Sequence, residues 1–450
     1  MIRSFMKSAF DPNFPIRPRS FPFFYGWWIL IASSIGIIAS IPGQTMGFSV
    51  FTEILSEKLQ LNASVLSTSY LVGTIAGGVF LPAVGKLFDE IGARKLGSIV
   101  CVVMGIGLLY LSQVDRTAQF LQNLLTFIPA SWIGFLIITI GFFWLRFTGQ
   151  GALTMTSRSM LGKWFNRHRG LAISVSGVVV SFSFSLAPAV LDKLNQIFSW
   201  RMTWGGLGVA MMTVVLLFVW LFFRDNPEEC ELRMDGAKED ERVKEEKNKD
   251  IIIHREFTRA EALRTHSFWI FNLSIALHSF AITGFTFHIL DIARDIGIER
   301  SLMLRAFVPS SVIGIVISLI GGVVNPFVRL KYILAIFPIG GILFTIGPIW
   351  HLESMLWLLI VGLGISGGVF GLLIGLVWPR FFGRKHLGAI SGVNMSTNVY
   401  ASALAPLIFS LCRDLTGHYH LIFVSLLVCY ALVLATCFFA DNPQRKLASD

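Results

Sequence analysis

The stretch GKLFDEIGARK, residues 85–95, lies directly between two apolar runs and decides how the chain folds. It carries five charged side chains within eleven residues, although only 14% of the whole chain is charged. Glycines stand at positions 85 and 92. A dense cluster of charge between two apolar runs predicts a short polar loop that joins two buried or membrane-spanning segments.

The composition of the chain favours the membrane. The 450 residues are 54% hydrophobic, include 40 phenylalanines and have a mean hydropathy of +0.68, whereas a soluble protein of this length needs far more surface charge. Crossing a bilayer takes about 20 apolar residues, and the backbone of such a segment must pair its own polar groups in a helix. The sequence therefore predicts an all-α polytopic membrane protein with twelve spans, at about 25–47, 64–84, 97–113, 131–157, 170–192, 203–223, 266–287, 305–326, 331–350, 355–378, 388–411 and 420–440.

Basic residues predict the orientation of the spans. With a cytoplasmic N-terminus, the cytoplasmic tails and loops hold 28 Lys and Arg and the outer loops hold eight, while Arg146 lies inside a helix. This asymmetry follows the positive-inside rule and accounts for the net charge of +10. We therefore expect a multi-pass protein of the plasma membrane with both termini in the cytoplasm and no nucleic-acid partner. The first 24 residues lack the apolar core of a cleaved signal peptide.

The two halves of the chain resemble each other around a charged middle segment. GLAIS at 170–174 matches GAISG at 388–392, and SLAPAV at 185–190 matches ALAPLI at 403–408, with the same spacing of 218 residues between Gly170 and Gly388 as between Pro188 and Pro406. An internal repeat of six helices is typical of a transporter whose substrate site lies near the membrane midplane. We expect a monomer with an N-terminal tail (1–24), a six-helix bundle (25–223), a charged linker (224–265), a second six-helix bundle (266–440) and a C-terminal tail (441–450).

The charged stretch also fits a known pattern. It matches G-x-L-x-D-x-x-G-x-R-[KR] at Gly85, Leu87, Asp89, Gly92, Arg94 and Lys95. In this position between the second and third spans, it resembles the hallmark loop of the major facilitator superfamily. The resemblance implies two pseudo-symmetric six-helix bundles and a conformational latch formed by Gly85, Asp89, Gly92, Arg94 and Lys95. Gly92 permits a tight turn, and Asp89 is suited to accept hydrogen bonds from a facing helix N-terminus and to pair with Arg94.

Shorter segments indicate which branch of the superfamily the chain resembles. Four segments are similar to sequences of the bacterial branch that contains monocarboxylate transporters and oxalate/formate antiporters. They are FYGWWIL (24–30), RDNPEE (224–229), EFTRAEALRTHSFW (256–269) and RFFGRKHLGAISG (380–392). The pair Ala187-Pro188 replaces the glycine-proline motif of many drug antiporters, which argues against a drug exporter. The chain departs from anion exchangers of this branch in two ways. The interior of the span 305–326 has no basic residue, since Arg305 lies near its predicted outer end, and the span 388–411 has no lysine.

Two ionisable residues fall near the middle of a predicted span, Arg146 and His278. An arginine at a helix centre costs roughly 2.5–3.5 kcal/mol on insertion scales, so it points to a functional site. The sequence allows two roles for Arg146. Its guanidinium binds a substrate carboxylate, or it donates hydrogen bonds to backbone carbonyls of a neighbouring helix and so serves only the fold. Polar residues at helical spacing complete the predicted substrate site, which consists of Arg146, Gln150, Thr154, Gln44, His278, Asn394 and Asn398.

A cation without a matching carboxylate near the midplane favours an anionic substrate. The candidates for proton coupling are His278, His288 and Asp291, although a lone histidine in an apolar helix is also typical of packing. Proton symport and exchange of one anion for another both remain open. The predicted function is alternating-access transport of a small organic anion, a monocarboxylate.

Other function classes fit the sequence less well. No GxxxxGK[ST] loop is present, which excludes an ATP-driven pump as far as this chain goes. No nucleophile–base pair and no metal-ligand spacing is visible, so we expect neither an enzyme nor a metal or cofactor site. A carrier of a neutral solute, an exporter of amphiphilic compounds and a transport-inactive sensor remain as alternatives.

Overall fold

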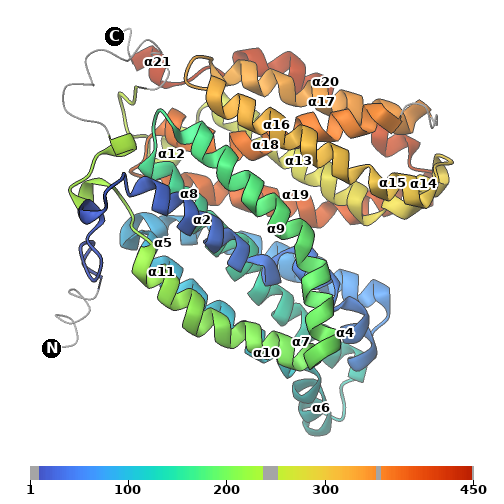
Figure 1. Cartoon of the computed structure of the whole chain (residues 1–450). Coiled ribbons are helices and arrows are strands. Elements are labelled where there is room, and N and C mark those ends of the chain that lie inside the picture. The colour runs from blue at the N-terminus through green and yellow to red at the C-terminus, as the bar shows by residue number, and fades with distance from the viewer. Residues whose placement is uncertain (1–9, 237–251, 351–355, 448–450) are drawn as a thin grey trace. The chain divides into compact units, whose positions relative to one another are not determined.

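The computed structural model describes residues 10–236, 252–350 and 356–447, and these residues form helices, turns and loops without a strand (Figure 1). Ten of the described helices are long and apolar enough to cross a membrane. One of them, Ser64–Ser112, bends at Gly92 and holds two of the predicted spans, and a shorter apolar helix, Gly26–Ala39, begins the first predicted span. The twelve predicted spans are therefore helical, the first of them with a break after α2, and the predicted all-α class is confirmed.

By their internal packing, the described residues divide into two compact units. The first unit comprises the described parts of Met1–Trp164, Val179–Gly236 and Ser391–Ser396. Its elements in chain order are α2 (Gly26–Ala39), η2 (Ile41–Gly43), α3 (Thr45–Ser49), α4 (Thr52–Lys58), α5 (Ala63–Ser112), α6 (Val114–Leu124), α7 (Ala130–Leu145), the π-helical segment η3 (Arg146–Leu153), α8 (Thr154–Trp164), the second part of α9 (Arg169–Phe198), α10 (Trp200–Ala210), the π-helical segment η4 (Met211–Val215) and α11 (Leu216–Phe222).

The second unit comprises the described parts of Phe165–Val178, Ala237–Ile390 and Thr397–Asp450. After the first part of α9, it continues with a short helix, α12 (Arg259–Leu263), which has a capping box in which Thr258 and Glu261 pair reciprocally. The elements that follow are α13 (His266–Phe287), α14 (Ile289–Asp295), α15 (Arg300–Arg305), α16 (Phe307–Val324), α17 (Leu330–Trp350), α18 (Leu356–Phe382), α19 (Leu387–Thr416), α20 (His420–Thr436) and α21 (Gln444–Leu447).

These units differ from the predicted bundles 25–223 and 266–440. The first half of α9 packs within the second unit, because its small side chains admit a close neighbour. The Ser174 hydroxyl donates to the Ser318 carbonyl of α16 at 2.5 Å, and a Cβ on Gly170 would lie 2.7 Å from the Gly322 carbonyl oxygen. In the first unit, the Ser396 hydroxyl of α19 donates to the Gly78 carbonyl of α5 at 2.7 Å.

The predicted linker 224–265 is also divided. Residues 224–236 pack in the first unit and 252–265 in the second, and the most charged part of the linker, 237–251, lies outside the described residues.

The apolar side chains on the outer face of α16 fit a lipid environment. Val308, Val312, Val316 and Ile320 recur every four residues and are between 48% and 70% exposed. A row of this kind on one helix face would be unfavourable in water but is suited to hydrocarbon. The outer face of α16 is therefore suited to contact lipid.

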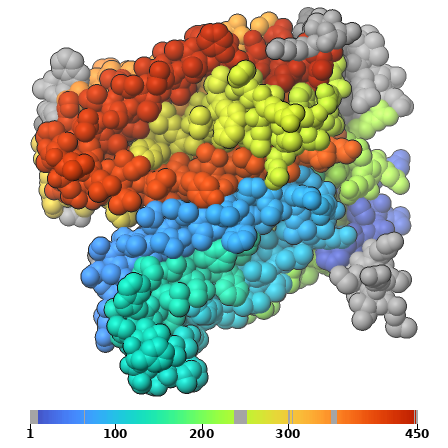
Figure 2. Space-filling model, turned by 180° about the vertical axis from the view of Figure 1, so that it is seen from behind, coloured from blue at the N-terminus to red at the C-terminus, as the bar shows by residue number. Residues whose placement is uncertain are grey.

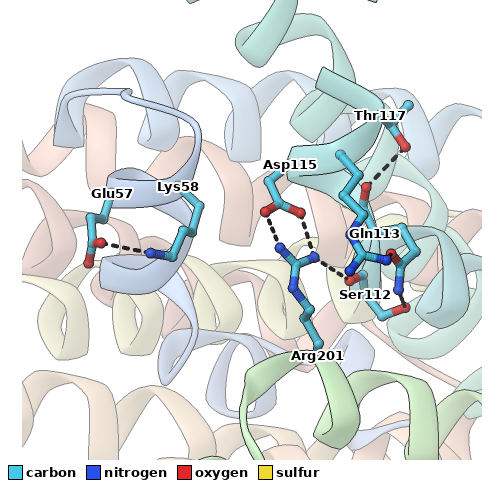
Figure 3. Close-up of polar contacts among 8 residues, drawn as sticks. Glu57, Lys58, Ser112, Gln113, Asp115, Thr117 and Arg201 are labelled. Carbon is cyan, nitrogen blue, oxygen red and sulfur yellow. Dashed lines mark hydrogen bonds and ion pairs between the residues drawn. The ribbon is translucent and has the colours of Figure 1, made fainter. Parts of the chain in front are cut away.

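A helix that the sequence did not predict, α6, follows the second half of α5. Arg201, at the start of α10, holds it in place through both oxygens of Asp115 and through the Ser112 carbonyl, the latter at 3.1 Å (Figure 3). The Asp115 side chain is 7% exposed and that of Arg201 29%. A second pair in the same view, Glu57 and Lys58, is far more exposed, at 74% and 43%.

We expect Asp115→Ala to lower the free energy of unfolding by about 1–2 kcal/mol, because Arg201 loses a partly buried partner. Burial alone raises the pKa of Asp115, but hydrogen bonds from Arg201 and the backbone outweigh it and hold the pKa below its usual value. The stabilisation is therefore present at neutral pH and is lost as the pH falls through the lowered pKa. Denaturant unfolding of the detergent-solubilised protein at several pH values measures it. The control is Glu57→Ala, expected to cost less than about 0.5 kcal/mol, and equal effects of the two changes would contradict the prediction.

Candidate functional site

The first membrane helix is interrupted at the point where the candidate site lies. After α2 ends, Pro42 and Gly43 form the turn η2, and Gln44 is extended before α3 begins. A Cβ on Gly43 would collide with the Leu145 carbonyl oxygen and lie 2.8 Å from the Gly149 Cα, so backbone meets backbone here. Discontinuous helices of this kind place backbone polar groups inside a membrane protein and are typical of transporter binding sites.

The opposing segment is the π-helical stretch η3, RFTGQGAL. Hydrogen bonds of the i→i+5 type widen the helix and bring residues four to five positions apart onto one line. Arg146, Gln150 and Thr154 have this spacing, so they form the polar row that the sequence predicted. Gly149 lies against Gly43, since a Cβ on Gly149 would lie 2.9 Å from the Gly43 Cα. Segments of this type occur frequently at functional sites.

Arg146 is buried, with 3% of its surface exposed. Its Nη1 donates to the Gly43 carbonyl and to the Thr45 hydroxyl, both at 3.3 Å, and its guanidinium lies 5.0 Å from the centre of the Tyr70 ring. Its Nε and Nη2 have no hydrogen-bond partner among the described residues. The guanidinium therefore has long bonds to backbone and hydroxyl on one side and unpaired donors on the other.

Four further polar side chains complete this cluster. The Gln44 amide donates to the Ser40 hydroxyl at 3.0 Å and to the Thr154 hydroxyl at 3.2 Å, and Thr154 also bonds Ser40 at 3.1 Å. The Oε1 of Gln150 is buried without a hydrogen-bond partner among the described residues. We call Ser40, Gln44, Thr45, Tyr70, Arg146, Gln150 and Thr154 the arginine cluster.

Four of the predicted substrate residues thus lie in the arginine cluster: Gln44, Arg146, Gln150 and Thr154. Tyr70, whose hydroxyl lies 2.8 Å from the Thr45 hydroxyl, was not predicted from the sequence. A single tyrosine in an apolar span has no periodic partner, so nothing in the local pattern marks it.

Of the other three predicted residues, His278 and Asn398 lie in the second unit and Asn394 lies in the part of α19 that belongs to the first unit. His278 is 7% exposed, and its ring stacks on Phe370 at 4.4 Å and meets Phe337 edge-on at 6.0 Å. Aromatic contacts of this kind match the packing interpretation of this histidine, and its roles in substrate binding and proton coupling stay predictions.

Asn394 and Asn398 lie on α19, which pairs with α13 through polar side chains. Ser279 donates to the Asn398 Oδ1 at 2.6 Å, and the hydroxyls of Thr283 and Ser402 lie 3.1 Å apart one turn further on. Hydrogen bonds of this kind join helices in a membrane, so the Asn398 carbonyl serves helix packing in this structure. Asn394 is buried, and its proposed contact with substrate stays a prediction, as does that of Asn398.

The two remaining candidates for proton coupling lie at the end of α13 and in α14. The His288 ring bonds the Pro406 carbonyl at 2.9 Å and the Tyr419 hydroxyl at 3.2 Å. Asp291 faces Arg294 and Arg413, each at 3.5 Å. His288 and Asp291 are thus held by groups outside the arginine cluster.

The glycine of the charged loop has the backbone conformation that the sequence predicted. Gly92 has φ +79°, which L side chains rarely adopt, and α5 turns there. The next residue, Ala93, donates its N–H to the Asp225 carboxylate at 3.0 Å, and Lys163 donates to the same carboxylate at 2.9 and 3.0 Å. Asp225 therefore joins the loop to the ends of α8 and α11, a role that its place in RDNPEE did not reveal.

The expected pairing of Asp89 with Arg94 is wrong for this structure. Arg94 is buried and donates to the Trp220 carbonyl in the last turn of α11 at 2.6 Å and to the Asp11 carbonyl at 2.9 Å. Carbonyls in the last turn of a helix lack a partner within the helix, so they are available to such a donor. Lys95 is exposed, with its ammonium 6.0 Å from the Phe10 ring, and Gly85 is buried.

The predicted N-terminal tail packs against the first unit from Phe10 onward. Arg224, 1% exposed, donates to the carbonyls of Pro12 at 2.6 Å, Phe14 at 3.3 Å and Ile16 at 3.1 Å. Burial lowers the pKa of its guanidinium. We call this group of contacts the loop cluster. It consists of Asp225, Lys163, Arg94 and Arg224, with the carbonyls of residues 11–16.

Comparisons with known proteins agree on the architecture. The family model described as "Major Facilitator Superfamily" matches residues 120–406. The chain is 27% identical over 224 residues, 46% of its length, to the multidrug transporter FLU1 of Candida albicans (strain SC5314 / ATCC MYA-2876), and this match spans 32% of that relative. Two solved structures share the fold. The human organic anion transporter MFSD10 matches with a TM-score of 0.59 and 14% identity, over 92% of this chain and 99% of that one. The proton:xylose symporter XylE matches with a TM-score of 0.64 and 15% identity, over 93% and 98%.

Proposed function

Because the chain belongs to the major facilitator superfamily, we propose that it is a secondary carrier that moves a small organic anion, a monocarboxylate, across the membrane by alternating access. The observation that supports this substrate class is Arg146. It is a buried guanidinium with two unpaired donors, and none of its hydrogen-bond partners among the described residues is a carboxylate.

The charge balance of the arginine cluster favours an anion. A buried cation without a counter-charge costs several kcal/mol, and a substrate carboxylate supplies both the negative charge and acceptors for the Nε and Nη2 donors. The tie to Gly43 and Thr45 is long, at 3.3 Å, so it leaves the guanidinium able to take a second partner. Gln44, Gln150 and Thr154 would then contact the polar rim of the same ligand.

Two processes could drive transport in this proposal. One is exchange of one anion for another, and the other is proton symport through His278 or through His288 and Asp291. The loop 85–95, with Gly85, Asp89, Gly92, Arg94 and Lys95, serves as the conformational latch. We place the carrier in the plasma membrane as a monomer, with both termini in the cytoplasm. The substrates named for the organic anion transporter and for XylE belong to those two proteins and are not evidence for the substrate of this chain.

The second candidate function is export of amphiphilic compounds, and the partial match to a protein named as a multidrug transporter favours it. Carriage of a neutral solute is a further alternative, in which Arg146 serves only as a structural tie. These alternatives differ from the organic-anion proposal in the ligands that stabilise the protein.

A thermal-shift panel on the purified protein tests the proposal. We expect small monocarboxylates to raise the unfolding temperature, because a ligand at about 100 times its dissociation constant stabilises by roughly 2.7 kcal/mol. Dicarboxylates, neutral sugars and cationic amphiphiles are the comparison ligands, with chloride at equal ionic strength as the control. Stabilisation by cationic amphiphiles alone would replace the organic-anion proposal with the exporter, and stabilisation by sugars alone would replace it with the neutral-solute carrier.

A further inference from the structure

The segment that joins α5 to α7 has a fixed place relative to the ends of three spans. α5 ends at Ser112, α7 begins at Ala130 and α10 begins at Trp200, and Arg201 links the start of α10 to Ser112 and Asp115. Figure 1 shows α6 beyond the ends of α7 and α10, and Figure 2 shows this part of the chain, in teal, standing out from its neighbours. Helices that cross a membrane end near its surface, so we expect α6 to lie close to that surface.

The surface of α6 has three distinct faces. Val114, Asp115 and Ala118 are buried against the rest of the first unit. At about 100° per residue, the exposed remainder separates into two flanks. One flank is polar, with Gln119 and Asn123, and the other is apolar, with Phe120 and Leu124.

The apolar flank is strongly exposed and continues into the next helix. Phe120 is 67% exposed and Leu124 65%, and they are followed by Phe127 at 80% and by Trp132, in the first turn of α7, at 65%. Transferring a side chain of this size from water to an apolar environment gains about 1.5–3 kcal/mol of free energy. Four such side chains in a row are therefore expected to contact an apolar partner. Tryptophans at the end of a span are typical of the boundary between lipid and water.

From this arrangement we propose that α6 and residues 125–132 form a foot that lies in the lipid–water interface. Phe120, Leu124 and Phe127 insert into the lipid, and Gln119 and Asn123 face water. The occupant is lipid because the apolar flank is continuous with Trp132 on a membrane-spanning helix, and because the foot lies where three spans end. An amphipathic helix in the plane of the interface binds by the same physics. The ion pair between Asp115 and Arg201 fixes the rotation of α6 and so decides which flank meets the lipid.

Spin labels on adjacent residues test the foot in the full chain. Single cysteines at positions 119, 120, 123 and 124, in a background with Cys429→Ser, are labelled after reconstitution into phosphatidylcholine nanodiscs. All four positions are at the surface of α6, so a label displaces no core side chain. We expect relaxation by oxygen relative to a water-soluble nickel complex to be several-fold higher at 120 and 124 than at 119 and 123.

Two other results would overturn the proposal. Equal access of the nickel complex to all four positions would place both flanks in water. Dipolar broadening between labels at position 120, appearing only when two copies share a disc, would assign the apolar flank to a second copy of this chain. Phe120→Asp is a further variant, and it is expected to remove the oxygen preference of a label at 124 while leaving the helix α6 folded. An unchanged preference in that variant would also contradict the foot.

Discussion

Arg146→Gln is expected to abolish the stabilisation of this carrier by small carboxylates. Removing one partner of a buried, hydrogen-bonded charge pair costs about 2–5 kcal/mol, which weakens binding by a factor of roughly 30 or more. Gln keeps a polar side chain but has neither the charge nor the forked donors of a guanidinium. Isothermal titration with the carboxylate that gives the largest thermal shift measures the change.

The effect must be separated from loss of fold. The matched control is Arg116→Gln, which makes the same change at an exposed arginine and is expected to leave affinity unaltered. If Arg146→Gln does not yield folded protein, Tyr70→Phe and Thr45→Val probe the same site, because they remove neighbours of the guanidinium and keep its charge. Wild-type carboxylate affinity in folded Arg146→Gln would show that the anion binds elsewhere. It would also leave Arg146 with its structural role alone.

Asp225→Ala is expected to lower the free energy of unfolding by about 3 kcal/mol or more. The Lys163 side chain is 4% exposed and that of Asp225 is 12%, and removing one member of a buried ion pair leaves an uncompensated charge. The change also deprives the Ala93 N–H of its acceptor at the turn of the charged loop. Unfolding of the detergent-solubilised protein by denaturant measures the loss.

A double variant distinguishes the pair from a general effect of mutation. Asp225→Leu with Lys163→Met removes both charges and is expected to recover much of the stability, because the cost of the single change is the orphaned partner. Arg19→Ala, which breaks an ion pair whose side chains are 70% and 65% exposed, is the control, and it is expected to cost less than about 1 kcal/mol. A single Asp225 variant as stable as wild type would contradict the role of the loop cluster.

Several parts of the site could be predicted from the sequence because their signals are local. The turn at Gly92 follows from a glycine inside a charged stretch, and the structure has a positive φ there. The row Arg146, Gln150, Thr154 follows from spacing along one helix. Gln44 was predicted as a substrate residue, and the structure places it at the break in the first span.

Other parts of the site depend on residues far apart in the chain. Asp225 meets Ala93 across 132 positions and Lys163 across 62, and no local pattern connects these three residues. Arg94 was expected to pair with Asp89, five residues away, but its buried guanidinium binds carbonyls of Trp220 and Asp11. Tyr70 became part of the arginine cluster only because α5 packs beside η3. The apolar flank of α6 was also missed, since the helix is short and carries polar residues.

The sequence alone determined the all-helical class, the twelve spans and the family, because a bilayer acts on each segment separately. Every span must satisfy its own backbone and offer about 20 apolar residues, so hydropathy and glycine-rich charged loops are readable one segment at a time. The tertiary structure alone decided which polar groups meet. Two side chains pair only when their helices pack at the right depth and rotation, and that choice depends on the shapes of many residues at once. For that reason the arginine was predictable as a functional residue, whereas its long bonds to Gly43 and Thr45 and its unpaired donors became visible only in the folded chain.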